Sequence, residues 1–290
     1  MDHLVYISFG QGRHVDEVRF SVQTAARHLE TSGGGRWQID VWTDTPRLWK
    51  DLPVEVVEVA PEQVDAWMGP HRYVWRSKIE VLRAALERSE GGRCLYVDGD
   101  TWWRRSPSVV FDRIGPGRSV MHLREGRPPA PEVAALEHVL QRYQPVDTSG
   151  RAWVFPPDRD SWNAGVIGLD PADAVVCAEV ALLTDQLLEH GFGDHSHTSE
   201  QLAFAVGLAA RTTVSESRDA VVHYWPSEMR EPFGAALAEA RTADGVDQDV
   251  LFTRLWDQRP RPTAQRAAKD TAKRLLRRVG RAPLTPPSSW

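Results

Sequence analysis

The stretch Cys94-Leu95-Tyr96-Val97-Asp98-Gly99-Asp100 decides the fold that we expect of this chain. Its first four residues predict a buried strand, because short apolar runs that end at turn residues are typical of parallel sheets. Two carboxylates follow, and residues two apart on extended chain point to the same face. At the carboxyl end of a parallel strand, that face opens into the crevice where open α/β sheets bind ligands.

The acid pair suits a divalent cation. The carboxylates of Asp98 and Asp100 are hard oxygen donors, which Mg²⁺ and Mn²⁺ prefer when they bind together with a diphosphate. Gly99 has no side chain, so it leaves room for a phosphate to approach the backbone. The alternative interpretation is a strand-end turn with two solvated acids.

Strands and helices alternate on both sides of this stretch. The alternation predicts an α/β fold with a mostly parallel central sheet and helices on both of its faces. We expect strands at residues 4–9, 37–43, 54–59, 93–97, 120–123, 166–169, 212–214 and 220–224, and helices at 15–29, 75–86, 132–143, 172–190 and 200–209. Residues 144–159 form a polar, proline-containing stretch of the kind that often serves as a lid or binding loop.

The composition is that of a soluble globular protein. The chain has 290 residues with 41% hydrophobic and 26% charged residues, enough to bury a sizeable core. Its formal charge of −5 implies no nucleic-acid partner. Cys94 and Cys177 are expected to be buried thiols in a reducing compartment. We see no signal peptide and no run near the ~20 apolar residues of a membrane span, so we expect a cytoplasmic protein.

The last 32 residues differ from the rest, so we divide the chain into a domain at 1–258 and a basic C-terminal extension at 259–290. The extension carries nine basic residues and one acid, a formal charge of +8, which leaves −13 on the first 258 residues. Ala264, Ala268, Thr271, Leu275 and Val279 can form one stripe of a helix, with basic residues largely opposite. We expect the extension to bind an anionic membrane surface through electrostatics, which would suit a lipid-linked acceptor; the alternative is that it folds back on the acidic body.

Four segments in order carry a resemblance to a known family. They are Leu95 to Asp100, Trp162-Asn163-Ala164-Gly165-Val166-Ile167, Glu200-Gln201 and Val221-Val222-His223. Together they resemble the metal-binding, donor-binding and catalytic motifs of GT-A glycosyltransferases, in particular the retaining enzymes of family 8 and its relatives. The resemblance covers residues 4 to 233. It implies a Rossmann-like GT-A domain that transfers a sugar from a nucleotide-sugar to a saccharide, a lipid-linked molecule or another small acceptor.

The resemblance also assigns roles to single residues. It implies that Asp98, Asp100 and His223 hold Mn²⁺ or Mg²⁺ against the donor diphosphate, and that Glu200 and Gln201 lie near the anomeric carbon. Further donor contacts are expected from Tyr6, Ser8, Asp44, Arg76, Lys78, Asn163, Ala164, Gly165 and Arg230. Only one of Arg76 and Lys78 can face the site. The run after His223 departs from family 8, which has a glycine and then Lys-Pro-Trp; Arg230 is the candidate substitute for that lysine.

Two further expectations concern the substrates. The Asn163–Gly165 and Glu200-Gln201 pattern predicts retention of anomeric configuration, whereas an inverting enzyme would need a carboxylate base, for which Asp158, Asp160 and Glu200 are candidates. Aromatic rings beside the motifs could stack on a sugar or a base; these are Trp102, Trp103, Trp162 and Trp225.

Three other functions compete with glycosyl transfer. In a haloacid-dehalogenase-type phosphatase, Asp98 would attack phosphorus and Asp100 would act as acid and base. A sugar nucleotidyltransferase is suggested by Gly10-Gln11-Gly12-Arg13, which loosely resembles a phosphate loop but lacks the expected Pro and Lys. A non-catalytic carbohydrate-binding relative would keep sugar binding without the metal.

Overall fold

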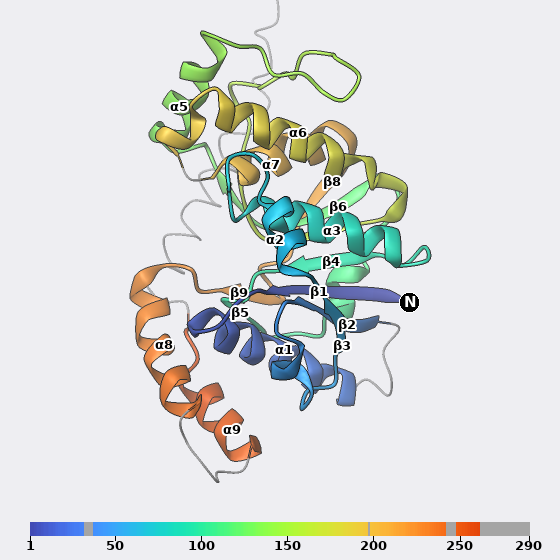
Figure 1. The fold of residues 1–290 in the computed structure, drawn as a ribbon, viewed down its shortest axis with the longest axis vertical. Coiled ribbons are helices and arrows are strands. Elements are labelled where there is room, and N and C mark those ends of the chain that lie inside the picture. Colours follow the sequence, from blue (N-terminus) through green and yellow to red (C-terminus); the bar gives the residue numbers. More distant parts are fainter. Residues whose placement is uncertain (32–36, 197, 242–247, 262–290) are drawn as a thin grey trace, which may run out of the picture.

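A seven-stranded sheet forms the centre of the molecule (Figure 1). The structure is a computed structural model that describes residues 1–31, 37–196, 198–241 and 248–261. The large sheet contains β1 (Asp2–Ser8), β2 (Trp37–Thr43), β3 (Glu55–Glu58), β4 (Cys94–Val97), β6 (Arg118–Gly126), β7 (Ser161–Leu169) and β8 (Thr213–Glu216). Two short strands, β5 (Thr101–Trp103) and β9 (Val221–His223), form a separate ladder.

The strand order is β3-β2-β1-β4-β7-β6-β8, and only β7 runs against its neighbours. The expected α/β class with a mostly parallel sheet is therefore confirmed. The reversal of β7 has a local cause: the chain between β6 and β7 stays at the carboxyl edge of the sheet, so β7 enters from that edge. Its first residues consequently lie beside the end of β4, where the Asp98 amide donates to the Gly165 carbonyl at 2.9 Å.

Helices cover both faces of the sheet (Figure 1). The longer helices are α1 (Arg13–Thr31), α3 (Arg76–Arg88), α5 (Ala130–Leu140), α6 (Val175–Glu189), α7 (Ser199–Arg211), α8 (Ser227–Arg241) and α9 (Gln248–Gln258), and the short ones are α2 (Pro61–Trp67), α4 (Ser108–Phe111), η1 (Pro46–Trp49), η2 (Pro171–Asp173) and η3 (Phe192–Asp194). The apolar faces of α3, α6 and α7 share one core cluster with the sheet, and α1 packs in a second cluster on the other face. Burial of these faces supplies the main driving force for the fold.

The helices α8 and α9 are absent from the sequence-based prediction. They pack on α1 and β5 in a third core cluster, where the rings of Phe20 and Phe233 lie 4.9 Å apart. The Trp102 indole donates to the Pro260 carbonyl at 2.9 Å, so the chain just after α9 still contacts the domain. The apolar stripe expected in the basic extension lies outside the described residues, and membrane binding by that extension stays a prediction. Among the helices that the structure describes, none is both long and apolar enough to cross a membrane.

Candidate active site

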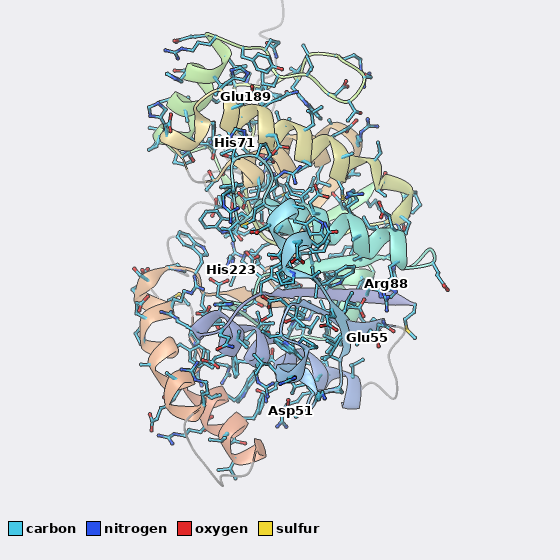
Figure 2. All side chains as sticks on the ribbon, viewed as in Figure 1. Asp51, Glu55, His71, Arg88, Glu189 and His223 are labelled. Atoms are coloured by element: carbon cyan, nitrogen blue, oxygen red, sulfur yellow. The ribbon has the colours of Figure 1, made fainter. Side chains whose placement is uncertain are left out.

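The acid pair and His223 meet at the carboxyl edge of the sheet. Asp98 and Asp100 lie in the turn between β4 and β5, and β5 pairs with β9 so that Thr101 opposes His223. The amide of Tyr224 donates to the Asp100 carbonyl at 2.9 Å, which fixes the end of β9 against this turn. As a result, one donor atom from each of Asp98, Asp100 and His223 lies within 4.8 Å of the others. Figure 2 shows His223 near the upper end of α8.

The imidazole of His223 is held in one orientation. Its Nδ1 lies 2.9 Å from the Asn163 Oδ1, and its Nε2 lies 3.1 Å from the Asp100 Oδ1. Because an amide oxygen only accepts, we assign the proton of the neutral ring to Nδ1, which turns the Nε2 lone pair toward the two acids. A Cβ on Gly165 would lie 2.3 Å from this ring. Glycine is therefore needed at position 165 for the His223 ring to pack there, while Gly165 also lines the cavity and its expected donor contact stays a prediction.

Without a cation, this cluster is an ion pair. Burial lowers the pKa of His223, but the Asp100 carboxylate outweighs burial and raises it above its ordinary value. Burial likewise raises the pKa of Asp100, and the charges of His223 and Arg230 outweigh it and lower that pKa. The Arg230 Nη1 lies 3.3 Å from the Asp100 Oδ2. The Nε of the same guanidinium donates to the Glu17 carboxylate at 2.8 Å.

The residues present fit a divalent cation. Two carboxylates and one imidazole converge, a donor set that suits Mn²⁺ or Mg²⁺ with phosphate oxygens or water completing the shell. The Asp98 carboxylate is already oriented, since the Tyr96 hydroxyl donates to it at 2.7 Å and the Lys78 Nζ lies 3.3 Å away. Such outer contacts hold ligands in place for a metal.

A buried lysine links the acid pair to α7. The Lys78 Nζ lies 3.5 Å from the Glu200 Oε1 in addition to its contact with Asp98. Burial lowers the pKa of Lys78, but the two carboxylates outweigh burial and raise it, so the lysine stays charged. The Tyr73 hydroxyl also donates to Glu200. Beside Glu200, the Gln201 Oε1 accepts from the Ala164 amide at 3.2 Å, which ties α7 to β7.

One cavity of about 710 Å³ contains this constellation. It brings together most of the residues that the sequence singled out, namely Lys78, Asp98, Asp100, Asn163, Ala164, Gly165, Glu200, Gln201, His223 and Arg230. Of the pair Arg76 and Lys78, the lysine faces the site. Arg76 instead forms a bidentate contact with Asp185 at 2.8 and 3.1 Å, so its expected donor contact is wrong.

Three residues at the ends of β1 and β2 do not reach the cavity wall. Tyr6 is wholly buried, and its hydroxyl contacts Ser21 at 3.0 Å and Trp103 at 2.8 Å, so it cannot contact a nucleoside as expected. Ser8 is also buried, which corrects the same expectation for its hydroxyl. Asp44 is half-buried and accepts from the Gly10 amide at 2.7 Å; its contact with a nucleoside stays a prediction.

The expected room at Gly99 is taken by protein. A Cβ there would lie 2.4 Å from the Val18 side chain, so glycine is needed for α1 to pack against the turn, not for a phosphate. Of the four tryptophans expected beside the site, Trp102 and Trp103 are buried core residues and Trp162 lines a different cavity. Of these four, Trp225 alone lines the cavity of the acid pair.

The sequence reasoning missed several residues of this cavity. Trp75 and Glu17 line it, and Tyr73 and Tyr96 hold its carboxylates. Tyr96 could have been found, because it precedes Asp98 by two residues on extended chain and shares its face. The other three carry no local signal, since only the tertiary fold brings them to the acid pair.

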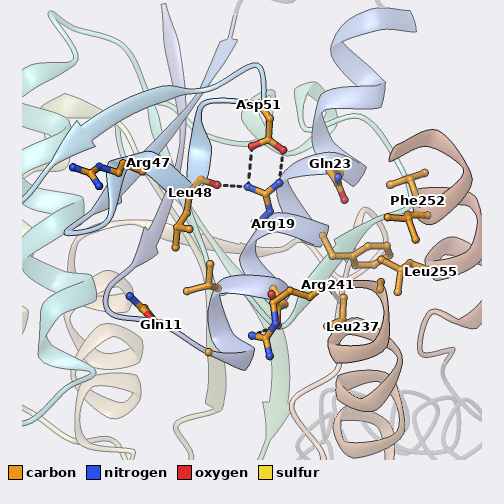
Figure 3. A pocket seen from close by; sticks show the side chains of 16 residues that line it. Gln11, Arg19, Gln23, Arg47, Leu48, Asp51, Leu237, Arg241, Phe252 and Leu255 are labelled. Atoms are coloured by element: carbon orange, nitrogen blue, oxygen red, sulfur yellow. Dashed lines mark hydrogen bonds and ion pairs between the residues drawn. The ribbon is translucent and has the colours of Figure 1, made fainter. Parts of the chain in front are cut away.

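A larger cavity, of about 880 Å³, lies between α1, η1 and the helices α8 and α9 (Figure 3). Its lining includes the ion pair of Arg19 with Asp51 and the side chains of Phe252 and Leu255. The donor atoms that could hold a metal among the described residues are in the smaller cavity. We therefore take the smaller cavity as the candidate active site.

Among the comparisons with known proteins, the one with solved structures shows the fold. No protein-family model matches the chain. No curated protein matches it in sequence. The structure of galactosyltransferase LgtC, in complex with donor and acceptor sugar analogues, superposes with a TM-score of 0.51 at 12% identity, over 85% of this chain and 98% of that one. This likeness shows the GT-A fold that the sequence predicted.

Two other solved structures match less well. Mouse xyloside xylosyltransferase 1 gives a TM-score of 0.46 at 12% identity, over 74% of this chain and 84% of that one. The bifunctional glycosyltransferase WbbM gives 0.41 at 12% identity, over 74% of this chain and 38% of that one.

Proposed function

We propose that the chain is a glycosyltransferase that moves a sugar from a nucleotide-diphosphate sugar to an acceptor with the help of a divalent metal. One observation carries the proposal: Asp98, Asp100 and His223 converge at the carboxyl edge of a GT-A sheet, inside a cavity. This edge is where open α/β sheets bind ligands. The donor set favours Mn²⁺ or Mg²⁺.

The side chains of the cavity divide the work. A bound cation supplies Lewis-acid stabilisation of the charge that develops on the diphosphate. Arg230 and Lys78 flank the acid pair and can neutralise phosphate oxygens in a partly dry site, where charge contacts are stronger than in water. Glu200 and Gln201 lie at the start of α7 on the same cavity wall, and there they position the donor sugar.

Retention of configuration is the second part of the proposal. An inverting enzyme needs a carboxylate poised to take the acceptor proton. Among the candidates for this base, Glu200 contacts Lys78 and Tyr73, Asp160 pairs with Arg124, and Asp158 lines another cavity. Because each candidate base is already in an ion pair or lies at another cavity, these contacts favour retention, in agreement with the Glu200-Gln201 pattern.

The stereochemical prediction has a direct test. Once a donor and acceptor pair is found, we expect the proton NMR spectrum of the initial product to show the anomeric coupling of the donor. Product with the opposite coupling would mean inversion. In that case Glu200→Gln should lower kcat far more than Gln201→Glu, because a base would have been removed.

The competing functions lack a supporting observation. The phosphatase would need Asp98 as a nucleophile, but its carboxylate accepts from Tyr96 and contacts Lys78, and it follows the fourth strand of the chain. The nucleotidyltransferase would use the 10–13 loop for phosphate, but Arg13 contacts Glu17 at 3.1 Å and Glu231 at 3.0 Å.

Metal dependence tests the proposed function. Asp98→Asn and Asp100→Asn should keep the fold, because both residues lie in a turn at the edge of the sheet. Each should weaken Mn²⁺-dependent binding of UDP or GDP about 100-fold or more, since one charged ligand is lost. Calorimetric titration of the nucleotide with Mn²⁺ and with EDTA measures this.

Asp51→Asn is the matched control, because Asp51 is an ion-paired aspartate outside the cavity. It should bind nucleotide as the wild type does. Undiminished Mn²⁺-dependent binding by both active-site variants would overturn the assignment, and covalent phosphorylation of Asp98 by a phosphate ester would favour the phosphatase.

A further inference from the structure

Two exposed tryptophans stand at the candidate active site. Of the tryptophans that the structure describes, Trp75 and Trp225 expose 44% and 49% of their surface, whereas the others are buried or half-buried. Both line the cavity of the acid pair. Two exposed indole rings on one polar cavity can bury a large apolar area against a bound ligand, which is strongly favourable.

Neighbouring residues fix the backbone of Trp225 and pack against the ring of Trp75. Trp225 follows Tyr224, whose amide is bonded to Asp100, and precedes Pro226, whose carbonyl accepts from the first turn of α8. The proline restricts the backbone of the residue before it. Trp75 stands at the start of α3, and its ring lies 5.3 Å from that of Tyr73.

Trp75 lies on the side of the cavity near Glu200, where we expect the donor sugar. Its neighbour Tyr73 donates to Glu200, which lies with Gln201 at the start of α7. A nucleoside is expected on the other side of the acid pair, over the carboxyl ends of β1 and β2. Trp225 in turn lies two residues beyond His223 and is followed by the α8 residue Arg230, which contacts Asp100. Trp75 and Trp225 therefore line the cavity from two separate elements, the start of α3 and the segment between β9 and α8.

We propose that Trp75 and Trp225 form the acceptor subsite and stack on the apolar face of a pyranose ring, so that the acceptor is a saccharide or presents a sugar at its end. This inference rests on the proposed function and names its acceptor class. Indole rings supply large, rigid contact area at low entropic cost, and their faces suit the C–H face of a sugar. The carboxylates and amides of the same cavity can bond the hydroxyls on the ring edge.

Saturation-transfer NMR with methyl glycosides of glucose, galactose and mannose tests the subsite. The full-length protein is loaded with UDP or GDP and with Mg²⁺, which avoids the paramagnetic broadening of Mn²⁺. We expect at least one glycoside to bind saturably, with transfer concentrated on its ring C–H protons. Trp75→Ala and Trp225→Ala should each weaken that binding about tenfold, while Trp75→Phe and Trp225→Phe should stay within about threefold of the wild type.

Leu48→Ala is the matched control, since Leu48 is an exposed apolar residue outside this cavity. It should leave glycoside binding unchanged. The subsite is wrong if the wild type binds none of the glycosides, if the alanine variants bind them equally well, or if those variants weaken nucleotide binding instead, which would place the rings on the nucleobase. If nucleotide still binds in a metal-dependent way in these cases, the proposed function stands. If the wild type shows no metal-dependent nucleotide binding, the proposed function is overturned.

Discussion

At the scale of single residues, Asn163 sets the state of the candidate metal site. Its Oδ1 accepts from the Gly165 amide at 3.0 Å and lies 2.9 Å from His223 Nδ1, so the amide oxygen faces the imidazole. This contact keeps the Nε2 of the neutral ring unprotonated and directed at Asp100. The sequence motif predicted a donor-sugar contact for Asn163, which stays a prediction; in the structure its amide oxygen orients the His223 ring.

We expect Asn163→Ala to lower the affinity for Mn²⁺ about 10- to 100-fold, because loss of an outer contact leaves the ligand ring free to turn. Asn163→Asp keeps an oxygen at the same place and should retain most of the affinity. Electron paramagnetic resonance titration of free Mn²⁺ measures both constants without a substrate. If Asn163→Ala binds Mn²⁺ as tightly as the wild type, His223 is oriented by other contacts or is not a ligand.

At the scale of secondary-structure elements, the sequence predicted what periodicity and end signals determine. The strand at 37–43 is observed as β2 with those bounds, and the helix expected at 200–209 is observed as α7, Ser199–Arg211. The reversed direction of β7 was not predicted, because a single strand carries no signal for the edge from which it enters the sheet. The helices α8 and α9 were also missed, since their apolar residues pack on Phe20 and Trp102, far away in sequence.

The candidate site shows the same division between local and tertiary information. The motif residues Asp98, Asp100 and His223 do converge, but through the ladder of β5 and β9, two strands of three residues each. Sequence could not choose between Arg76 and Lys78, because the choice depends on which face of α3 meets α6. There Asp185 of α6 engages Arg76 and leaves Lys78 to the cavity.

At the scale of the whole molecule, two buried histidines in contact make stability depend on pH in opposite directions. The rings of His122 and His223 lie 5.3 Å apart. Burial, followed by the charge of His223, lowers the pKa of His122 from 6.5 to about 3. Because the pKa of His122 is lowered, its contribution to stability is present above pH 6.5 and is lost as the pH falls toward 3, by roughly 5 kcal/mol in full.

His223 acts in the opposite sense. The pKa of His223 is raised, so its contribution to the free energy of unfolding is complete below pH 6.5. That contribution is lost as the pH rises through the pKa of His223 in the folded state. Without metal, the two effects together predict a maximum of stability near pH 6.5. A divalent cation needs His223 without its Nε2 proton, so metal binding strengthens as the pH rises.

We therefore expect Mn²⁺ to move the stability maximum to higher pH. At a free concentration 100 times its dissociation constant, the metal adds about 2.7 kcal/mol by mass action, and this gain should be largest above pH 7. Urea unfolding from pH 5 to 9, in EDTA and in Mn²⁺, measures the shift.

His122→Gln should flatten only the acidic side of both stability curves, and Asp100→Asn should abolish the difference between them. Curves with the same maximum in EDTA and in Mn²⁺ would show that the cation does not displace a proton from His223, and the imidazole would then have to be removed from the ligand set.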